Sequence, residues 1–342
     1  MSELLVKNGT VFSYIYEGYY AIRLLAADVH IEDGIITEVK PDIRPDCETL
    51  DASGCLVLPG IINMGASTFA ARITSGLLWD WRAGKSRVAP MLDMAAEMMT
   101  AEEARAVSML GLWETVSGGV TTVAELFRAD GGVGPLHYRA APEGLTAAMS
   151  RAADDLGVRL VATGEDKLPA GIVPESAVSC AHLGIPSEIP YDRVEHIRSG
   201  VKTTIGTGSF GNSMISEMRA AACAVKQTAG DAGAYRAGDV FYSVTVLNGG
   251  LLDAEKYGRV APGFLGDLSV VCMDRFAPLS YPLAQYVYGA NEGDVRHVVC
   301  GGNVLKRDCM PEGSLAASLP EAAKIAGSAI SRLWENARRV IL

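Results

Sequence analysis

The sequence contains no apolar run that approaches the ~20 residues a membrane-spanning helix requires. Its first residues, MSELLVKNGTVF, lack the charged-then-apolar pattern of a signal peptide. No cluster of lysine and arginine is present, and the net charge of -10 disfavours a nucleic-acid-binding surface. The seven cysteines include no Cys-x-x-Cys pair, which is typical of reduced thiols rather than of a disulfide framework. We therefore expect a cytoplasmic protein that binds neither nucleic acid nor membrane.

The composition is that of a well-packed globular protein. Hydrophobic residues make up 49% of the 342 residues and charged residues 20%. A chain of this length can bury one large core or two modest ones.

The two ends of the chain show the two-residue alternation of β-strands. In the first 56 residues, apolar and polar residues alternate around Gly and Asp turns, and Asp33-Gly34 marks a hairpin. The segments GDLSVVCMD and DVRHVVCGGNVLKRD repeat this pattern near the other end, with Gly301-Gly302 as a turn. We predict a small β-sandwich built from residues 1–56 and 258–310, followed by a helical segment at 311–342.

The middle of the chain changes to helical spacing. TAEEARAVSMLGLWETVSGG reads as a helix, with Thr100 and Glu103 forming a capping box at its start. Strand-like segments, among them GVTTVAELF, VRLVATG and VKTTIGTGS, alternate with helices, as in βα units. We count about five strands from residue 57 to roughly 210, fewer than the eight of a complete barrel. The predicted fold is α/β, with a shortened TIM-like (β/α) barrel over residues 57–257 that lacks units near 165–190.

Five segments carry a resemblance to a known family, and they occur in the family's order. They are LVLPGIIN, SGGVTTVAE, SGVKTTIGTGSFGNSMISEMRAAA, YGRVAPGFLGDLSVVCMD and DVRHVVCGGNVLKRD. Together they resemble the amidohydrolase superfamily, and most closely its cytosine-deaminase, guanine-deaminase and chlorohydrolase branch. The resemblance implies a barrel entered from the sandwich and, in an intact member, metal-dependent hydrolysis or deamination.

The family's metal ligands are missing from the matching positions. The family places His-x-His directly after Pro-Gly-hydrophobic-hydrophobic-Asn, where the two imidazoles hold Zn²⁺ or Fe²⁺. Those positions align with Gly65 and Ser67, and the family's Asp at the end of the last strand aligns with Gly208. Gly offers no ligand atom and Ser is a poor one. The resemblance therefore implies a degenerate metal site, and we expect no cofactor.

The five histidines give one further candidate at a strand end. His182, in SCAHLG, could lie at the barrel mouth, but a lone His needs two or three partners to hold a metal. Cys180 lies two residues earlier, so a Cys/His nucleophilic pair is geometrically possible. The alternatives are a hydrogen-bonded polar residue and a buried structural thiol.

Acidic residues supply the other candidates. Glu125 lies near the end of the strand TTVAEL, where it could line a cavity or cap the following helix. Glu165 and Asp166 would complete an atypical catalytic set with Cys180 and His182.

Two function classes follow from these observations. In the first, the chain is a pseudoenzyme or partner subunit that forms a homo-oligomer or a complex with an intact amidohydrolase, because a shortened barrel has open strand edges that must be covered. In the second, it is an active C–N hydrolase or deaminase with an atypical residue set. A small-molecule ligand in the barrel mouth is a third possibility. Metal analysis of the purified protein discriminates the first two.

Overall fold

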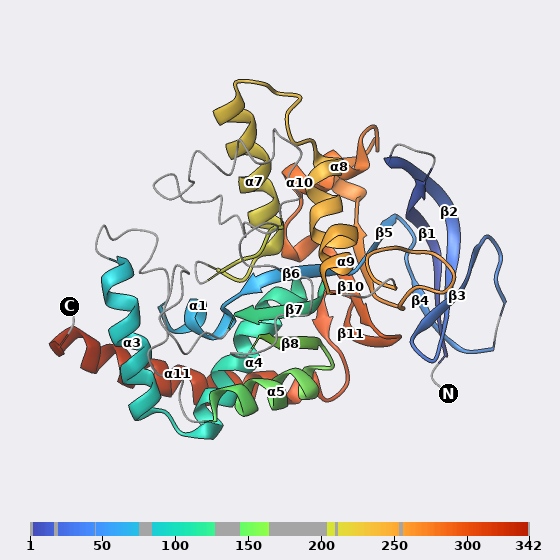
Figure 1. The fold of residues 1–342 in the computed structure, drawn as a ribbon. Helices are drawn as coiled ribbons and strands as arrows, with labels where there is room; N and C mark the ends of the chain where they lie inside the picture. Colours follow the sequence, from blue (N-terminus) through green and yellow to red (C-terminus); the bar gives the residue numbers. More distant parts are fainter. Residues whose placement is uncertain are drawn as a thin grey trace.

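A computed structural model describes residues 3–16, 20–44, 46–74, 84–126, 144–163, 204–208, 211–252 and 256–340. In the described part, a nine-stranded sheet lies at one end and a three-stranded parallel sheet lies at the centre, with helices on both sides of the latter (Figure 1). No helix among these residues is long and apolar enough to cross a membrane.

The nine-stranded sheet, here called the terminal sheet, combines strands from both ends of the chain. They are β1 (Glu3–Tyr16), β2 (Tyr20–Glu32), β3 (Ile35–Lys40), β4 (Glu48–Asp51), β5 (Cys55–Pro59), β9 (Leu268–Cys272), β10 (Val295–Cys300), β11 (Asn303–Arg307) and β12 (Met310–Pro311). The order is β12-β11-β10-β9-β5-β1-β2-β3, and β4 pairs with β1. The antiparallel pair of β5 and β9 joins the two ends.

The turns of the terminal sheet form where the sequence predicts them. Asp33 and Gly34 have φ angles of 47° and 80° and connect β2 to β3. Gly301 and Gly302, with φ angles of 54° and 78°, connect β10 to β11. Positive φ is the backbone conformation that short hairpin turns require, so both predicted turns are confirmed.

The terminal sheet encloses an apolar cluster of its own. Leu4, Val29 and Ile31 come from the N-terminal strands, whereas Val270 and Val299 come from the C-terminal ones, and all are buried. The two ends of the chain therefore share a core as well as a sheet.

The parallel sheet consists of β6 (Ile61–Ala66), β7 (Val120–Leu126) and β8 (Arg159–Thr163), in that order. The apolar run VLPGIIN could form one continuous strand, but Gly60 divides it into β5 and β6, which belong to different sheets. A Cβ atom at Gly60 would lie 2.3 Å from the Thr121 hydroxyl oxygen, so only glycine lets the chain cross between the sheets here.

Residues 204–208 lie along the edge of β6 that β7 leaves open. The predicted strand VKTTIGTGS is wrong for this described part, because the segment forms a single parallel bridge, between Ala66 and Gly208. Gly208 has a φ angle of 54°, which cannot continue a ladder. Gly206 approaches β6 so closely that a Cβ atom would lie 2.1 Å from the Met64 carbonyl oxygen.

The helices cover both faces of the parallel sheet. They are α1 (Thr68–Thr74), α3 (Gly84–Met98), α4 (Ala101–Ser117), α5 (Leu145–Leu156), α7 (Met214–Ala229), α8 (Ala237–Tyr242), α9 (Asn248–Leu251), α10 (Pro282–Gly289) and α11 (Leu315–Val340). The predicted capping box is confirmed, since the Glu103 amide donates to the Thr100 hydroxyl and the Glu103 carboxylate accepts from the Thr100 amide. A π-helical turn, Ser243–Leu247, connects α8 to α9.

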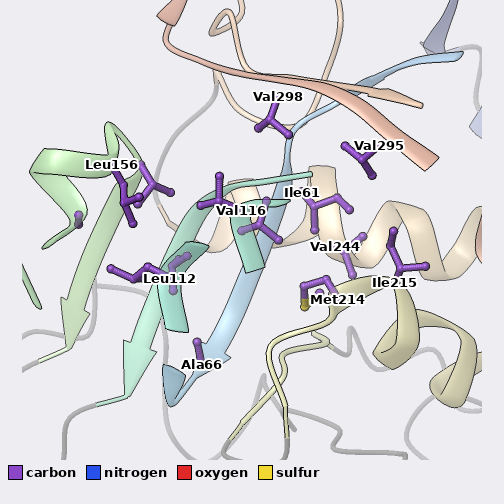
Figure 2. Packing of buried hydrophobic residues seen from close by; sticks show 14 of the residues in the cluster. Ile61, Ala66, Leu112, Val116, Leu156, Met214, Ile215, Val244, Val295 and Val298 are labelled. Atoms are coloured by element: carbon purple, nitrogen blue, oxygen red, sulfur yellow. The ribbon is translucent and has the colours of Figure 1, made fainter. Parts of the chain in front are cut away.

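One apolar core joins the parallel sheet to its helices and to the terminal sheet. Ile61 of β6 and Val116 of α4 lie near Val298 of β10, and Met214 of α7 and Val244 close the other side (Figure 2). Because β10 belongs to the terminal sheet and also contributes to this core, the two sheets pack against each other through buried apolar side chains.

Candidate functional site

The three positions where the resemblance places metal ligands lie together at the carboxyl end of β6. The Gly208 amide donates to the Gly65 carbonyl oxygen at 3.0 Å, and the Ser67 amide donates to the Gly208 carbonyl oxygen at 3.0 Å. These contacts join backbone to backbone. The segment after residue 203 and the end of β6 thus close on each other at the point where the family would hold a metal ion.

The backbone at Gly65 does not suit a side chain. Its φ angle is 99°, and the pairing of β6 with β7 slips between Met64 and Ala66, so Gly65 forms a bulge. A residue with a Cβ atom would be strained there. The bulge also interrupts the alternation that would point residues 65 and 67 to one side of the strand.

These residues do not fit the family's metal ion. Structural and catalytic Zn²⁺ sites use His, Cys or carboxylate donors. Of the three positions, Ser67 alone has a donor atom in its side chain, and that residue is 5% exposed. Among the described residues, histidine occurs only at His30 and His297, and both lie in the terminal sheet.

A buried amide occupies the middle of β6. Asn63 donates to the hydroxyl oxygens of Thr207 at 2.9 Å and of Thr115 at 3.3 Å, and it accepts from the Thr207 amide at 3.1 Å. All three residues are fully buried. The network fastens residues 204–208 and α4 to β6. The sequence signal for this network is Asn63 itself, a single polar residue that follows six apolar or small residues.

Glu125 stabilises a helix end. Its two carboxylate oxygens accept from the Thr68 amide at 2.7 Å and from the Thr68 hydroxyl at 3.0 Å. The capped helix is α1, which lies before β7 in sequence, and not the following helix that the sequence suggested. A role of Glu125 in lining a cavity stays a prediction. Burial raises the pKa of Glu125 to about 7, against hydrogen bonds from Thr68 and Phe69 that lower it.

The remaining catalytic candidates lie outside the described residues. Cys180, His182, Glu165 and Asp166 all fall between residues 163 and 204. Their proposed grouping around the mouth stays a prediction.

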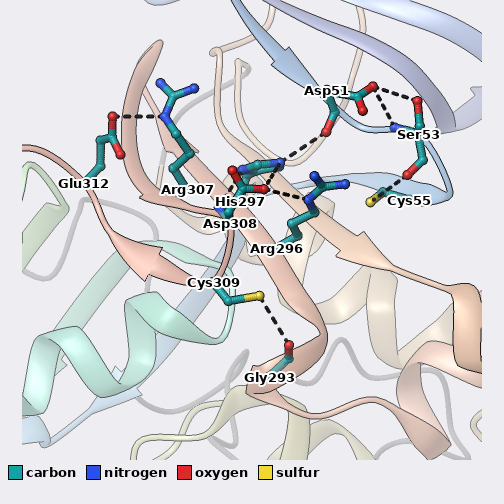
Figure 3. A network of polar contacts seen from close by, with 10 residues as sticks. All are labelled: Asp51, Ser53, Cys55, Gly293, Arg296, His297, Arg307, Asp308, Cys309 and Glu312. Carbon is teal, nitrogen blue, oxygen red and sulfur yellow. Dashed lines mark hydrogen bonds and ion pairs between the residues drawn. The ribbon is translucent and has the colours of Figure 1, made fainter.

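His297 has a structural role in the terminal sheet. The Asp308 amide donates to its Nδ1 at 3.2 Å, so Nε2 carries the proton and donates to the Asp51 carbonyl oxygen at 3.2 Å (Figure 3). Burial lowers the pKa of His297, which keeps the imidazole neutral. Figure 3 also shows the ion pairs of Arg296 with Asp308 and of Arg307 with Glu312 around it.

Two acidic groups near α7 were not found from the sequence. The Asn212 amide donates to Glu114 at 2.7 Å, and the Arg72 guanidinium pairs with the other oxygen of Glu114. Glu217, in the first turn of α7, is buried, and its Oε2 has no hydrogen-bond partner within the described part of the chain. Burial raises the pKa of Glu217 to about 8.

Comparison with known proteins shows which family the chain is similar to. Residues 191–305 match the pattern of the Amidohydrolase family. This part of the chain is similar to an amidohydrolase-family domain. A 5-methylthioadenosine/S-adenosylhomocysteine deaminase of Natronomonas pharaonis is 25% identical over 90% of this chain and 93% of its own length. A protein of the same name from Haloarcula marismortui is 39% identical, over 32% of this chain and 27% of its own length.

Solved structures show the same fold. A triazine hydrolase variant superimposes with a TM-score of 0.73 at 16% identity, over 96% of this chain and 100% of that one. A zinc-bound adenosine deaminase of Xanthomonas campestris gives a TM-score of 0.69 at 16% identity, over 96% and 98% of the two chains. The chain therefore has the α/β fold of amidohydrolases, as the motifs indicate.

Proposed function

We propose that this chain is an amidohydrolase-like protein without the family's metal-dependent activity, which acts as a pseudoenzyme or partner subunit. The observation that carries the proposal is the contact between Gly65 and Gly208. Two positions where the resemblance places metal ligands meet here through backbone atoms alone, because both residues are glycine. The third position, Ser67, is a buried residue with a hydroxyl group. A cytoplasmic location is part of the proposal, and the described cysteines, which are free thiols, support it.

We further propose that the barrel is shortened and that the terminal sheet forms the composite β-sandwich. The alignment with the Natronomonas pharaonis relative spans 415 positions, more than the 342 residues of this chain. Part of that relative therefore has no counterpart here. The described parallel strands are β6, β7 and β8, with residues 204–208 along the edge of β6.

Assembly follows from the shortened barrel in this proposal. Open strand edges leave unpaired backbone groups, and each one that is buried without a partner costs ~1–3 kcal/mol. A second copy of the chain or an intact amidohydrolase would cover them, through an interface of well over ~1,000 Å² in total. Light scattering of the protein alone, and mixed with an intact amidohydrolase of the same cell, tests this. A monomer under both conditions counts against it.

The enzymatic half of the proposal is tested by metal analysis and turnover together. We expect no transition metal bound at residues 65, 67 and 208, and no metal-dependent release of ammonia from purines, pyrimidines or triazines. Stoichiometric metal at these residues, located by anomalous scattering, contradicts the proposal.

One observation favours an active enzyme instead. The pKa of Glu125 is raised to about 7, the range that suits a general acid or base, and Glu125 lies at the carboxyl end of β7. In that case the names of the relatives point to 5-methylthioadenosine and S-adenosylhomocysteine as substrates to assay. This second function is established if the native protein turns over one of these substrates and the Glu125→Gln variant is folded but inactive.

A further inference from the structure

Potential metal ligands lie together in the terminal sheet, and not in the parallel sheet that carries the predicted barrel mouth. Within the described part of the chain, a ring nitrogen of His30, a carboxylate oxygen of Glu3 and the sulfur of Cys47 lie within 4.8 Å of one another. Glu3 opens β1, His30 lies on β2, and Cys47 directly precedes β4. The terminal sheet thus brings together three donors from three separate segments.

The imidazole is the fixed member of this group. His30 is buried, and its Nε2 lies 2.8 Å from Glu3 Oε1, so Nε2 is the nitrogen that faces Glu3. The Glu3 side chain is 39% exposed and Cys47 is half-buried, so the group opens to solvent on one side. An ion could enter from that side while the imidazole keeps its place.

The other ring nitrogen is held as a metal-binding histidine requires. Thr37 Oγ1 lies 2.9 Å from His30 Nδ1 and donates to the His30 carbonyl oxygen at 3.4 Å. His30 Nδ1 also lies 3.5 Å from Glu32 Oε1, so Nδ1 has polar partners of its own while Nε2 faces Glu3. With an ion bound, Nδ1–H would donate to the Thr37 hydroxyl oxygen or to Glu32, and the Nε2 lone pair would bind the ion.

The thiol has a proton to give up. Cys47 Sγ donates to the Glu48 carbonyl oxygen at 3.4 Å. When a divalent ion binds, a metal–sulfur bond replaces the S–H bond, and the proton is released to solvent.

We propose that Glu3, His30 and Cys47 bind a divalent transition-metal ion, for which Zn²⁺ is the best fit. One nitrogen, one sulfur and one oxygen ligand are the donors Zn²⁺ prefers, and water would complete a tetrahedron. At bond lengths of about 2.0–2.3 Å the donors would lie roughly 3.3–3.7 Å apart, a spacing that lies within the 4.8 Å limit that already holds for all three. The ion would tie the start of β1 to β2 and to the segment before β4.

Cobalt(II) spectroscopy on the full-length protein, stripped of metal, tests the proposal. Co²⁺ occupies tetrahedral zinc sites, and a cysteine thiolate bound to it gives a near-ultraviolet charge-transfer band. We expect this band in the native protein and its disappearance when Zn²⁺ displaces Co²⁺. Cys47→Ser abolishes the band, whereas Cys309→Ser, the matched removal of an exposed thiol, leaves it unchanged.

A second variant tests the histidine without removing a ligand. Thr37→Val removes the hydroxyl that orients His30, and we expect Co²⁺ to bind about 10- to 100-fold more weakly while the charge-transfer band keeps its position. Circular dichroism checks that each variant is folded. No band in the native protein at millimolar Co²⁺, or an equal band in folded Cys47→Ser, overturns the proposal.

These variants also separate this site from the barrel mouth. Metal that is lost from Cys47→Ser belongs to the terminal sheet and leaves the proposed function intact. Metal that persists in Cys47→Ser, and that anomalous scattering locates at residues 65, 67 and 208, contradicts the proposed function and overturns the assignment of metal to this site.

Discussion

The terminal sheet and the parallel sheet differ in what their strand ends carry. In the terminal sheet, strand ends hold His30, Glu3 and the ion pairs around His297. At the carboxyl end of β6, the corresponding edge of the parallel sheet holds Gly65 and Gly208, joined by backbone. Among the described residues, the two edges therefore differ: side chains make the contacts in the terminal sheet, whereas backbone groups make the contact between Gly65 and Gly208.

The difference separates residues that the fold requires from residues that only a functional site requires. The apolar core around Ile61, Val116 and Val298 does not depend on metal ligands at the mouth, because packing of buried apolar surface supplies the stability. The fold around β6 therefore does not require reactive side chains at positions 65, 67 and 208, since functional sites are carried by a fold rather than required by it.

The largest expected effect comes from separating the two ends of the chain. Deletion after Gly258 removes β9 to β12, and β9 lies between β5 and β10 in the terminal sheet. The apolar cluster around Leu4, Val29 and Ile31 then loses its C-terminal half, so we expect insoluble protein without a cooperative unfolding transition. Expression followed by thermal unfolding measures this.

Co-expression of residues 259–342 is the matched control, and it should restore part of the soluble protein. A soluble fragment 1–258 that unfolds cooperatively by itself would show that the N-terminal strands do not need the C-terminal ones.

A smaller effect, which depends on pH, is expected at Glu217. Burial raises its pKa to about 8, and the unfolded chain has the ordinary value of about 4.5. The folded state therefore holds the proton more tightly, and this contribution to stability is fully present below pH ~4.5 and is lost as the pH rises to about 8. The native protein should therefore lose a few kcal/mol of unfolding free energy as the pH rises over this range. Glu217→Gln, which has no carboxyl group at this position, should not show that loss.

Urea denaturation at pH ~5 and pH ~9 is the measurement, with the exposed Glu335→Gln as the matched control. The variant and the native protein should be similar at the lower pH, and the variant should be the more stable at the higher pH. Equal pH dependence in Glu217→Gln and native protein would mean that the carboxyl is ionised at neutral pH.

The next effect tests the closure at the mouth. Gly206→Ala places a Cβ atom 2.1 Å from the Met64 carbonyl oxygen, a backbone atom that cannot rotate away. We expect a loss of about 1–3 kcal/mol, seen as a lower denaturation midpoint. Gly211→Ala, whose Cβ atom meets nothing within 4 Å, is the matched control and should be neutral or slightly stabilising. Equal midpoints for the two variants would mean that the close contact of Gly206 with β6 does not contribute to stability.

Local features were predictable from the sequence, since they depend on neighbours along the chain. The Thr100–Glu103 capping box and the Asp33-Gly34 turn each involve a few consecutive residues, and both are observed. The pairing of the two chain ends followed from an alternation that can be read in each end separately.

Features that depend on distant residues were not predictable in the same way. Glu125 caps α1, which begins at Thr68, and no periodicity links those positions. Likewise, nothing in the sequence indicates that His30, Glu3 and Cys47 meet, because their approach is set by strand register and by the path into β4. The break at Gly60 was hidden because the strands on both sides are apolar.

The smallest expected effect tests a direct link between the two sheets. Arg159 of β8 reaches both carboxylate oxygens of Asp267, which directly precedes β9 and also accepts from the Gly301 amide at 2.8 Å. Arg159→Lys keeps the charge but replaces the two-pronged contact by a single ammonium group, so we expect a loss of about 1 kcal/mol in the free energy of unfolding.

The matched substitution is Arg105→Lys, because Arg105 also pairs with a carboxylate, that of Asp155. There the side chains are 35% and 41% exposed, whereas Asp267 is 7% exposed. Solvent weakens the exposed pair, so this substitution should change stability by less than about 0.5 kcal/mol. A larger loss from Arg159→Lys than from Arg105→Lys means that the pair joins the sheets energetically. Equal losses would leave the shared apolar core as the sole link that stability measurements detect.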